Sequence, residues 1–215
     1  MRLYHGSKSG LVGAIAPTSR DCCDFGRGFY MGDDPRQPLT LICRYEQAAF
    51  YDLDVDLSGL KVLDLETDLT WALVVAFNRG KMESLRGSRL HEDLDELQKG
   101  KDVIAGLIAN DRMFYMLDAF FRGDITDRAL VAALSALKLG RQYVAKTPEA
   151  CARIQIVSCH RLEQVERDQL AQVNEVQRRD GISLAERIRR EHRRDNGLYF
   201  DEILERFREK GLPAC

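Results

Sequence analysis

The chain has 215 residues and a hydrophobic fraction of 45%, so it is long enough to bury a core and is predicted to be globular. The chain has 32 lysines and arginines and 34 aspartates and glutamates, which gives a net charge of −2. This balance excludes a protein that binds duplex nucleic acid through a strong overall positive charge. There is no apolar run of about 18 residues and no signal-peptide hydrophobic region, so a cytoplasmic protein without a membrane partner is predicted.

Six cysteines are scattered along the chain, and none of them forms the Cys-x-x-Cys pair typical of a metal site. They are Cys22, Cys23, Cys43, Cys151, Cys159 and Cys215. The adjacent Cys22 and Cys23 suit neither a mutual disulfide nor a normal chelate. Reduced, mostly buried thiols and no bound metal are therefore expected.

The first part of the chain alternates short apolar runs with turn and helix signals. In chain order the predicted elements are a strand over 3–7, a polar connection over 8–23, a buried strand from Phe29, a helix over about 35–49, a hairpin over 50–65 and a helix over about 68–79. The hairpin is inferred from the turn signal Ser58-Gly59 between two alternating runs. Thr67 and Asp68 are the candidate caps of the last helix.

Residues 81–158 begin with a charged connection and continue with helices and strands. The predicted elements are a short helix over 91–99, a strand over 102–109, helices over about 112–122 and 126–137, a strand over 141–146, a short helix over 148–152 and a final strand over 153–158. Thr126 is the candidate cap of the second long helix. Residues 1–158 are therefore predicted to form one domain.

Residues 159–215 differ in composition and are predicted to form a helical C-terminal extension, with amphipathic segments over 161–195 and 198–210. These helices are expected to dock on the domain or on a second copy of the chain, or else to form a surface for another protein. Their arginine clusters suggest RNA, but the interspersed acids favour an ordinary solvated helix face.

The segment Asp24-Phe25-Gly26-Arg27-Gly28-Phe29-Tyr30-Met31-Gly32 carries the strongest functional pattern. Its glycines allow a backbone turn to approach a flat group closely, because no Cβ intervenes. Phe29 and Tyr30 are expected on opposite faces of the following strand, since successive side chains alternate. The first strand carries His5 before Gly6, and the two strand ends side by side would form a cleft with an imidazole, a phenol and exposed amides.

The pair of motifs resembles the ADP-ribosyltransferase superfamily, and more closely a bacterial family of unknown function with the same LYHGS and DFGRGFY pattern followed by QY. The resemblance covers residues 1–158. It implies an α+β fold with a split, antiparallel-rich β-sheet core, helical insertions and a helical C-terminal extension.

The resemblance also implies that NAD is the co-substrate and that no metal takes part. His5 would hydrogen-bond the adenosine-side ribose, Gly6 would offer backbone groups to the nicotinamide amide, and Tyr30 would stack on the nicotinamide ring and serve catalysis. Arg27 would pair with the diphosphate. The remaining cofactor-binding residues of the two matching segments would be Ser7, Gly28 and Phe29.

The third motif departs from the superfamily pattern, because Gln142 stands where a glutamate is usual. Glutamine can hold a ribose hydroxyl but cannot take up a proton, so Asp111 is the candidate for the missing carboxylate. Asp111 equally suits a cap of the following helix, and the two roles are compatible. The second aromatic that encloses nicotinamide has no clean match, since Tyr45 is displaced from that spacing and Tyr143 is only a substitute.

The function expected from this resemblance is mono-ADP-ribosylation of a protein or nucleic-acid target, with a bacterial toxin of a toxin–antitoxin pair as one candidate role. An antitoxin partner and a homodimer through the C-terminal helices both stay open. The alternatives are a non-catalytic module that binds NAD or ADP-ribose, an NAD glycohydrolase, and an interaction protein in which the cleft is vestigial.

Overall fold

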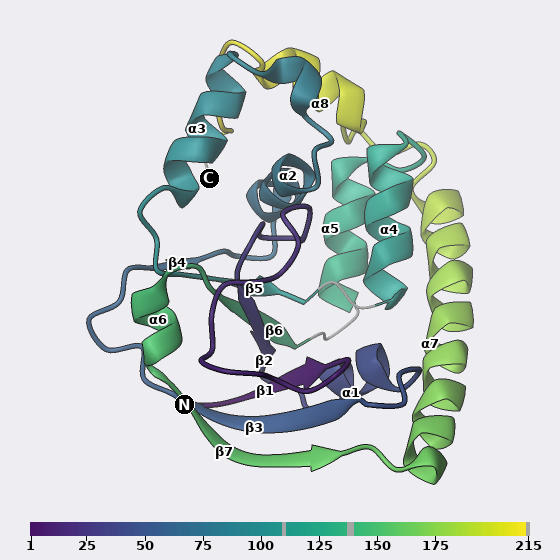
Figure 1. Ribbon diagram of the computed structural model, residues 1–215. Coiled ribbons are helices and arrows are strands. Elements are labelled where there is room, and N and C mark those ends of the chain that lie inside the picture. The colour runs from purple at the N-terminus through teal and green to yellow at the C-terminus, as the bar shows by residue number, and fades with distance from the viewer. Residues whose placement is uncertain (109–110, 137–139, 214–215) are drawn as a thin grey trace.

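The computed structural model describes residues 1–108, 111–136 and 140–213, and within these ranges the chain forms a seven-stranded mixed sheet and eight α-helices (Figure 1). The predicted α+β class is confirmed. The strands are β1 (Arg2–Ser7), β2 (Phe29–Gly32), β3 (Ala49–Val55), β4 (Val62–Asp64), β5 (Val103–Leu107), β6 (Arg141–Ala145) and β7 (Ile154–Arg161). Their order across the sheet is β4-β5-β6-β2-β1-β3-β7, and every neighbouring pair is antiparallel except β4 with β5.

The hairpin predicted over 50–65 is wrong. β3 pairs with β1 and β7, whereas β4 lies at the opposite edge of the sheet and runs parallel to β5. The turn at Ser58-Gly59 lies in the connection that carries the chain across the sheet. A turn signal between two alternating runs fixes a change of direction but not the strand partner, because pairing is decided by tertiary contacts.

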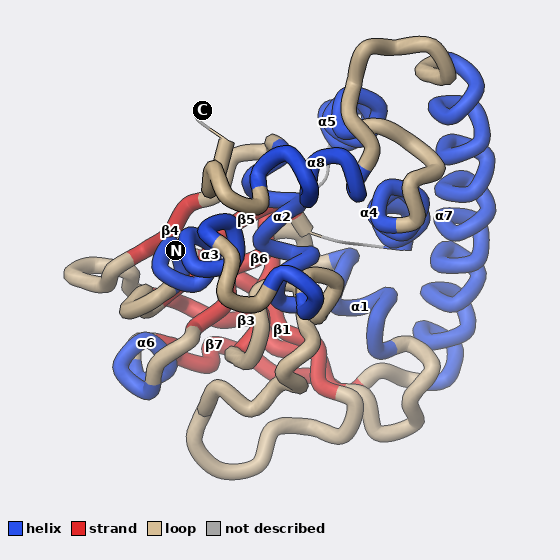
Figure 2. The backbone as a smooth tube through the Cα atoms, turned by 90° about the horizontal axis from the view of Figure 1, so that it is seen from above, coloured by secondary structure: helices blue, strands red, loops and turns tan. Residues whose placement is uncertain are grey.

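Most of the helices cover one side of the sheet and one flank of the molecule, while α6 lies on the other side, and α7 runs beside α4 and α5 (Figures 1 and 2). They are α1 (Arg36–Ile42), α2 (Leu69–Asn78), α3 (Arg89–Gln98), α4 (Asp111–Phe121), α5 (Asp127–Ala136), α6 (Pro148–Ala152), α7 (Gln164–Glu191) and α8 (Phe200–Phe207). The helix predicted over 35–49 ends early at Ile42, because the chain turns there to enter β3 at Ala49.

Side-chain caps fix the starts of several helices as the sequence predicts. Asp68 accepts a hydrogen bond from the Trp71 amide at 2.9 Å, and Thr126 accepts one from the Ala129 amide at 3.2 Å. These bonds satisfy amides that have no partner within their own helix.

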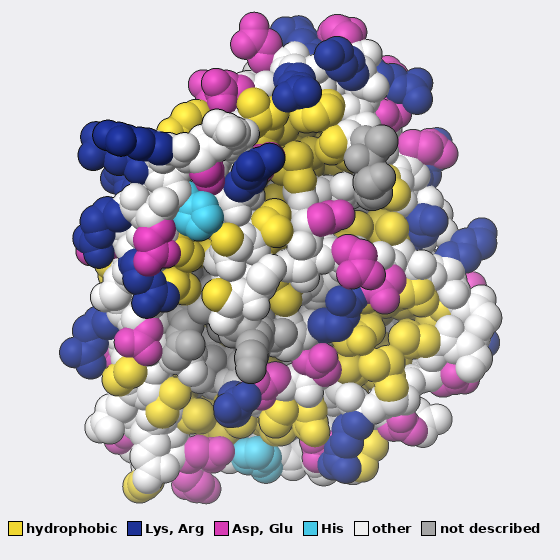
Figure 3. All heavy atoms as spheres, turned by 180° about the vertical axis from the view of Figure 1, so that it is seen from behind, with side chains coloured by type: hydrophobic (Ala, Val, Ile, Leu, Met, Phe, Trp, Pro, Cys, Tyr) yellow, Lys and Arg dark blue, Asp and Glu magenta, His cyan; other side chains and the backbone are white. Residues whose placement is uncertain are grey.

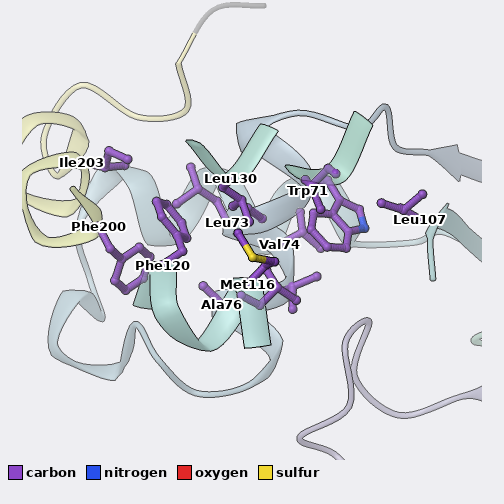
Figure 4. Close-up of a cluster of buried hydrophobic side chains, with 14 of the residues drawn as sticks. Trp71, Leu73, Val74, Ala76, Leu107, Met116, Phe120, Leu130, Phe200 and Ile203 are labelled. Carbon is purple, nitrogen blue, oxygen red and sulfur yellow. The ribbon is translucent and has the colours of Figure 1, made fainter. Parts of the chain in front are cut away.

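Two hydrophobic clusters lie on opposite faces of the sheet. The larger includes Trp71 and Phe120, both fully buried, and joins the strands to the helices above them (Figure 4). The smaller includes Leu3 and Phe29 and is covered by α6 and by the connection after β1. Strand alternation divides neighbouring residues between the two clusters.

The C-terminal helices dock on the core of the domain itself. Ile188 of α7 and Phe200 and Ile203 of α8 belong to the larger cluster, and Phe200 lies 5.3 Å from Phe120 between ring centroids (Figure 4). Other apolar residues of α7, among them Val165 and Val173, remain exposed. A second copy or an antitoxin as partner for this extension stays a prediction.

The sheet is split between β1 and β2. β1 and β3 pair over six residues, whereas β1 and β2 share the single register pair Tyr4 with Gly32. On its other side β2 pairs with β6 over all four of its residues. The seven strands nevertheless form one sheet, and the short ladder between β1 and β2 leaves an opening beside His5 and Tyr30.

The glycine before β2 serves packing between strands. A Cβ on Gly28 would lie 2.3 Å from Val144 Cγ1 and 2.9 Å from the Ala145 carbonyl oxygen of β6. The backbone at Gly28 was expected to approach a flat group closely, and in the structure it closely approaches strand β6.

We expect Gly28→Ala to lower the free energy of unfolding by about 1–3 kcal/mol, because the added methyl would overlap the Val144 side chain and the Ala145 carbonyl oxygen of β6. Urea denaturation measures the change. The neighbouring Arg27→Ala, at an exposed position, is the control and is expected to stay within about 0.5 kcal/mol of wild type. Equal stabilities for both variants would contradict the packing role.

Candidate functional site

A cavity of about 540 Å³ opens where the sheet splits. It is lined by residues of β1 and β2, by α1 and α4, and by the connection that precedes β2. Both α1 and α4 pack against α7, which closes this flank of the molecule (Figures 1 and 2). The residues that carry its chemistry are His5, Asp24, Tyr30, Arg79, Phe114 and Gln142.

His5 bridges the two separated strands. Its Nδ1 lies 2.7 Å from the backbone oxygen of Tyr30, and its ring stacks on Phe29 with centroids 4.3 Å apart. Because a carbonyl only accepts, Nδ1 carries the proton and Nε2 of the neutral ring keeps a lone pair. Burial lowers the pKa of His5, against a smaller opposing effect of the bond to Tyr30. His5 can therefore accept a hydrogen bond from a hydroxyl group, as predicted for a ribose.

Tyr30 uses its hydroxyl to hold the turn before its own strand. The hydroxyl donates to the Gly26 carbonyl at 2.7 Å and accepts from the Phe25 amide at 3.0 Å. Burial raises the pKa of Tyr30, so the phenol stays neutral. The hydroxyl is thus engaged within the protein, and what Tyr30 has to offer a ligand is its ring.

The rings of His5 and Tyr30 lie on opposite faces of the sheet. His5 stacks on Phe29, a member of the smaller cluster, while Tyr30 packs against the larger one. The alternation expected for Phe29 and Tyr30 is confirmed. Both residues nevertheless line the same cavity, because the split leaves an opening between their strands.

Gln142 on β6 is 5% exposed and has a fixed orientation. Its Nε2 donates to the Leu107 carbonyl at 3.2 Å and to Asp24 Oδ2 at 3.3 Å. Both neighbours are acceptors, so the nitrogen must point toward them and its two hydrogens are engaged. Oε1 is then the atom with which Gln142 can hold a ribose hydroxyl.

Asp24 forms a largely buried ion pair with Arg79, and the sequence analysis does not single out either residue as functional. Arg79 Nε donates to Asp24 Oδ1 at 2.8 Å, and the two side chains are only 13% and 19% exposed. The guanidinium also lies 5.5 Å from the ring centroid of Phe114. The sequence could have indicated Asp24, because it is the acid that begins the glycine motif. Its pairing with Arg79 could not be predicted, since the two residues lie 55 positions apart in the chain.

Several predicted cofactor-binding residues lie outside the cavity. Arg27 is exposed and pairs with Asp21 at 3.0 Å, and Phe29 is buried in the smaller cluster. Ser7 pairs with Ala49 at the end of β1. With Gly28 packed on β6, none of these four lines the hollow. Their proposed contacts with NAD stay predictions that this arrangement does not favour.

The other candidates are distributed as follows. Asp111 begins α4, but its side chain lies outside the described part of the structure. Tyr45 is 39% exposed outside the cavity, and Tyr143 packs against the smaller cluster. Phe114, which lines the cavity from α4, is the aromatic that the sequence analysis missed.

Two further properties bear on possible partners. Among the residues that the structure describes, no group of three or more His, Cys, Asp or Glu could hold a metal ion. No helix within the described ranges combines the length and apolar character needed to cross a membrane. Cys22 and Cys23 are free thiols that line the cavity.

Comparison with known proteins gives one match. The family described as "Protein of unknown function (DUF3990)" matches residues 1–156, which is most of the chain and almost the whole predicted domain. No curated protein and no solved structure matches.

We expect Tyr30→Phe to lower the free energy of unfolding by about 1–3 kcal/mol, because a buried amide and a carbonyl lose their partner. Urea denaturation provides the measurement. The matched control is Tyr45→Phe, an exposed tyrosine whose change is expected to be below about 0.5 kcal/mol. The hydroxyl does not hold the turn if Tyr30→Phe is as stable as the control.

We expect the stability of the protein to fall on acidification through His5. Its pKa is lowered in the folded state, so between that value and the ordinary value of about 6.5 the unfolded chain binds the extra proton. The stability that the neutral His5 contributes is complete above about pH 6.5, and it is lost as the pH falls from there through the lower pKa of the folded state.

The test compares wild type with His5→Asn, whose side-chain amide keeps a donor near the Tyr30 carbonyl but does not titrate. Denaturation at about pH 7.5 and about pH 5.5 should show a larger loss for wild type than for the variant. Equal losses in the two proteins would assign the acid sensitivity to other groups.

Proposed function

The chain belongs to the DUF3990 family, and from the site described above we propose that it transfers a single ADP-ribose from NAD to a protein or nucleic-acid acceptor. The observation that carries the proposal is the cavity at the split of the sheet, whose lining includes His5, Tyr30 and Gln142. Each comes from one of the three motifs that resemble the ADP-ribosyltransferase superfamily.

The size and the lining of the cavity support a dinucleotide ligand. Its volume of about 540 Å³ falls within the range of about 300–1,000 Å³ usual for small-molecule sites. Its lining combines aromatic surface from Tyr30 and Phe114 with the hydrogen-bonding groups of His5 and Gln142. Flat rings and ribose hydroxyls are the groups that such a lining suits.

Positive charge on the same lining comes from the exposed Arg20 and Lys81, whereas Arg79 is paired with Asp24. Cations of this kind suit the diphosphate of NAD, since charge-assisted hydrogen bonds to phosphate oxygens are strong. They take over the role that the sequence analysis assigns to Arg27, whose side chain is directed to Asp21.

The reaction needs little acid or base chemistry in its first step. The bond between nicotinamide and ribose weakens, positive charge develops on the ribose, and the enzyme contributes by fixing the geometry and stabilising that charge. A neutral His5 and a neutral Tyr30 are suited to holding NAD, and Gln142 Oε1 is suited to accepting from the ribose next to the reacting carbon.

The surface charge supports an acceptor bound by shape and local contacts. Lysine and arginine side chains alternate with acids over the face shown in Figure 3, in agreement with the net charge of −2. A long uninterrupted basic stripe, the usual footprint of duplex nucleic acid, is absent from that face.

The proposal is tested with NAD labelled separately in nicotinamide and in adenine, incubated with the full chain and a bacterial lysate. We expect free nicotinamide together with adenine label on a macromolecule. Tyr30→Ala should reduce both by at least about 100-fold because the ring that faces the nicotinamide is lost. Tyr45→Ala, which changes a tyrosine outside the cavity, is the matched control.

The other outcomes separate the alternatives. Nicotinamide release without label transfer identifies an NAD glycohydrolase. Binding of NAD, measured by calorimetry, without release identifies a binding module. If NAD neither binds nor reacts, the cavity does not serve this dinucleotide and the proposal is wrong.

A further inference from the structure

We propose that Asp24 is a catalytic residue of this site and that its Oδ2 supplies the carboxylate that Gln142 lacks. The inference rests on the proposed function and names the group that faces the reacting ribose. It follows from the contacts between Asp24, Arg79 and Gln142.

Gln142 cannot provide negative charge, yet it is joined directly to a group that does. Its Nε2 donates to Asp24 Oδ2 at 3.3 Å, so a carboxylate oxygen lies one hydrogen bond from the residue at the usual glutamate position. Asp24 also lines the cavity. The loop before β2 therefore places an acid beside Gln142 at the wall of the cavity.

The two oxygens of Asp24 have different surroundings. Oδ1 receives both of the hydrogen bonds from Arg79, whereas Oδ2 receives the one long bond from Gln142. A carboxylate oxygen can accept about two hydrogen bonds, so Oδ2 retains capacity for a further group. Arg79 thus orients the carboxylate and leaves Oδ2 for the cavity.

The backbone that follows Asp24 is held in place. The Tyr30 hydroxyl bonds Phe25 and Gly26, the Lys146 ammonium donates to the Phe25 carbonyl, and Gly26 adopts a positive φ of 69°. This support makes Tyr30 a positioning residue for Asp24 in addition to its contact with the cavity. A group fixed before the reaction loses little free energy to reorganisation when charge develops.

Among the described residues, Asp118 is the second acid that lines the cavity, and its surroundings differ. Its side chain is 35% exposed and pairs with Arg122, an exposed residue directly after the end of α4. Water screens such a charge more strongly than it screens the buried Asp24. Asp24 is also the acid bonded to Gln142, so it is the better placed of the two.

The proposed step balances as follows. The bond between ribose C1′ and the pyridinium nitrogen breaks, and its electron pair leaves on neutral nicotinamide. The ionised Asp24 stabilises the positive ribose while a lone pair of the acceptor forms the new bond to C1′. The proton of the acceptor passes to Asp24 Oδ2 and then to solvent.

The test measures NAD affinity and nicotinamide release separately for Asp24→Asn. This change keeps an oxygen for Arg79 but removes the charge. We expect release to fall by at least about 100-fold while the dissociation constant for NAD changes by less than about 3-fold. Asp24→Glu, which restores the charge, should recover part of the rate.

The matched control is Asp52→Asn. Asp52 is also largely buried and paired with an arginine, Arg2, at 2.7 Å, but it lies outside the cavity. Its release rate should equal that of wild type. If Asp24→Asn stays within about 3-fold of wild type while wild type is active, Asp24 is not catalytic and the proposed function stands. A wild-type protein that binds NAD without releasing nicotinamide would overturn both.

Gln142→Glu tests the same inference even if the Asp24 variants fold poorly. A glutamate there would place a second carboxylate against Asp24 Oδ2 and the Leu107 carbonyl, where Gln142 now donates two hydrogen bonds. We expect release to fall by about 10-fold or more, since like charges this close disfavour each other. A rate above that of wild type would show that Gln142 simply replaces the lost glutamate, and would overturn the role of Asp24.

Discussion

The separation of β1 from β2 is the constraint on which the site depends. Two strands that share one register pair leave backbone groups without ladder partners, and the Tyr30 carbonyl takes a hydrogen bond from the His5 imidazole in place of one from the neighbouring strand. A side chain therefore spans a gap that a continuous ladder would have closed. The cavity exists because the two half-sheets are joined in this way, and His5 owes its burial and its lowered pKa to the same position.

The stability of the fold does not by itself explain the ion pair between Asp24 and Arg79. Removing two charges from water costs several kcal/mol per ion, and well-packed apolar residues are often as stable. A pair that is nevertheless 13% and 19% exposed, at the wall of a cavity and bonded to Gln142, holds a charge in a defined place. That property is useful where charge develops during a reaction, and it links the loop before β2 to the strand that carries Gln142.

The helices support this arrangement from outside. α7 packs against both α4 and α1, the two helices that border the cavity, and α8 completes the larger cluster through Phe200 and Ile203. The C-terminal extension is thus part of the wall behind the site as well as of the core. The family match ends at residue 156, so this support comes from a segment beyond the matched region.

The sequence by itself determined most of the local elements and the three motifs, but neither the end of α1 at Ile42 nor the pairing of β3 and β4. Caps at Asp68 and Thr126 and the alternation of Phe29 and Tyr30 follow from periodicity and from side-chain chemistry within a few residues. The α+β class came from the family resemblance of the motifs. Only the tertiary structure decided that β4 crosses to the far edge of the sheet, that Gly28 packs on β6, and that Asp24 meets Arg79 and Gln142. These contacts join residues far apart in the chain, and their energies depend on burial and on the exact approach of two surfaces, neither of which a local pattern contains.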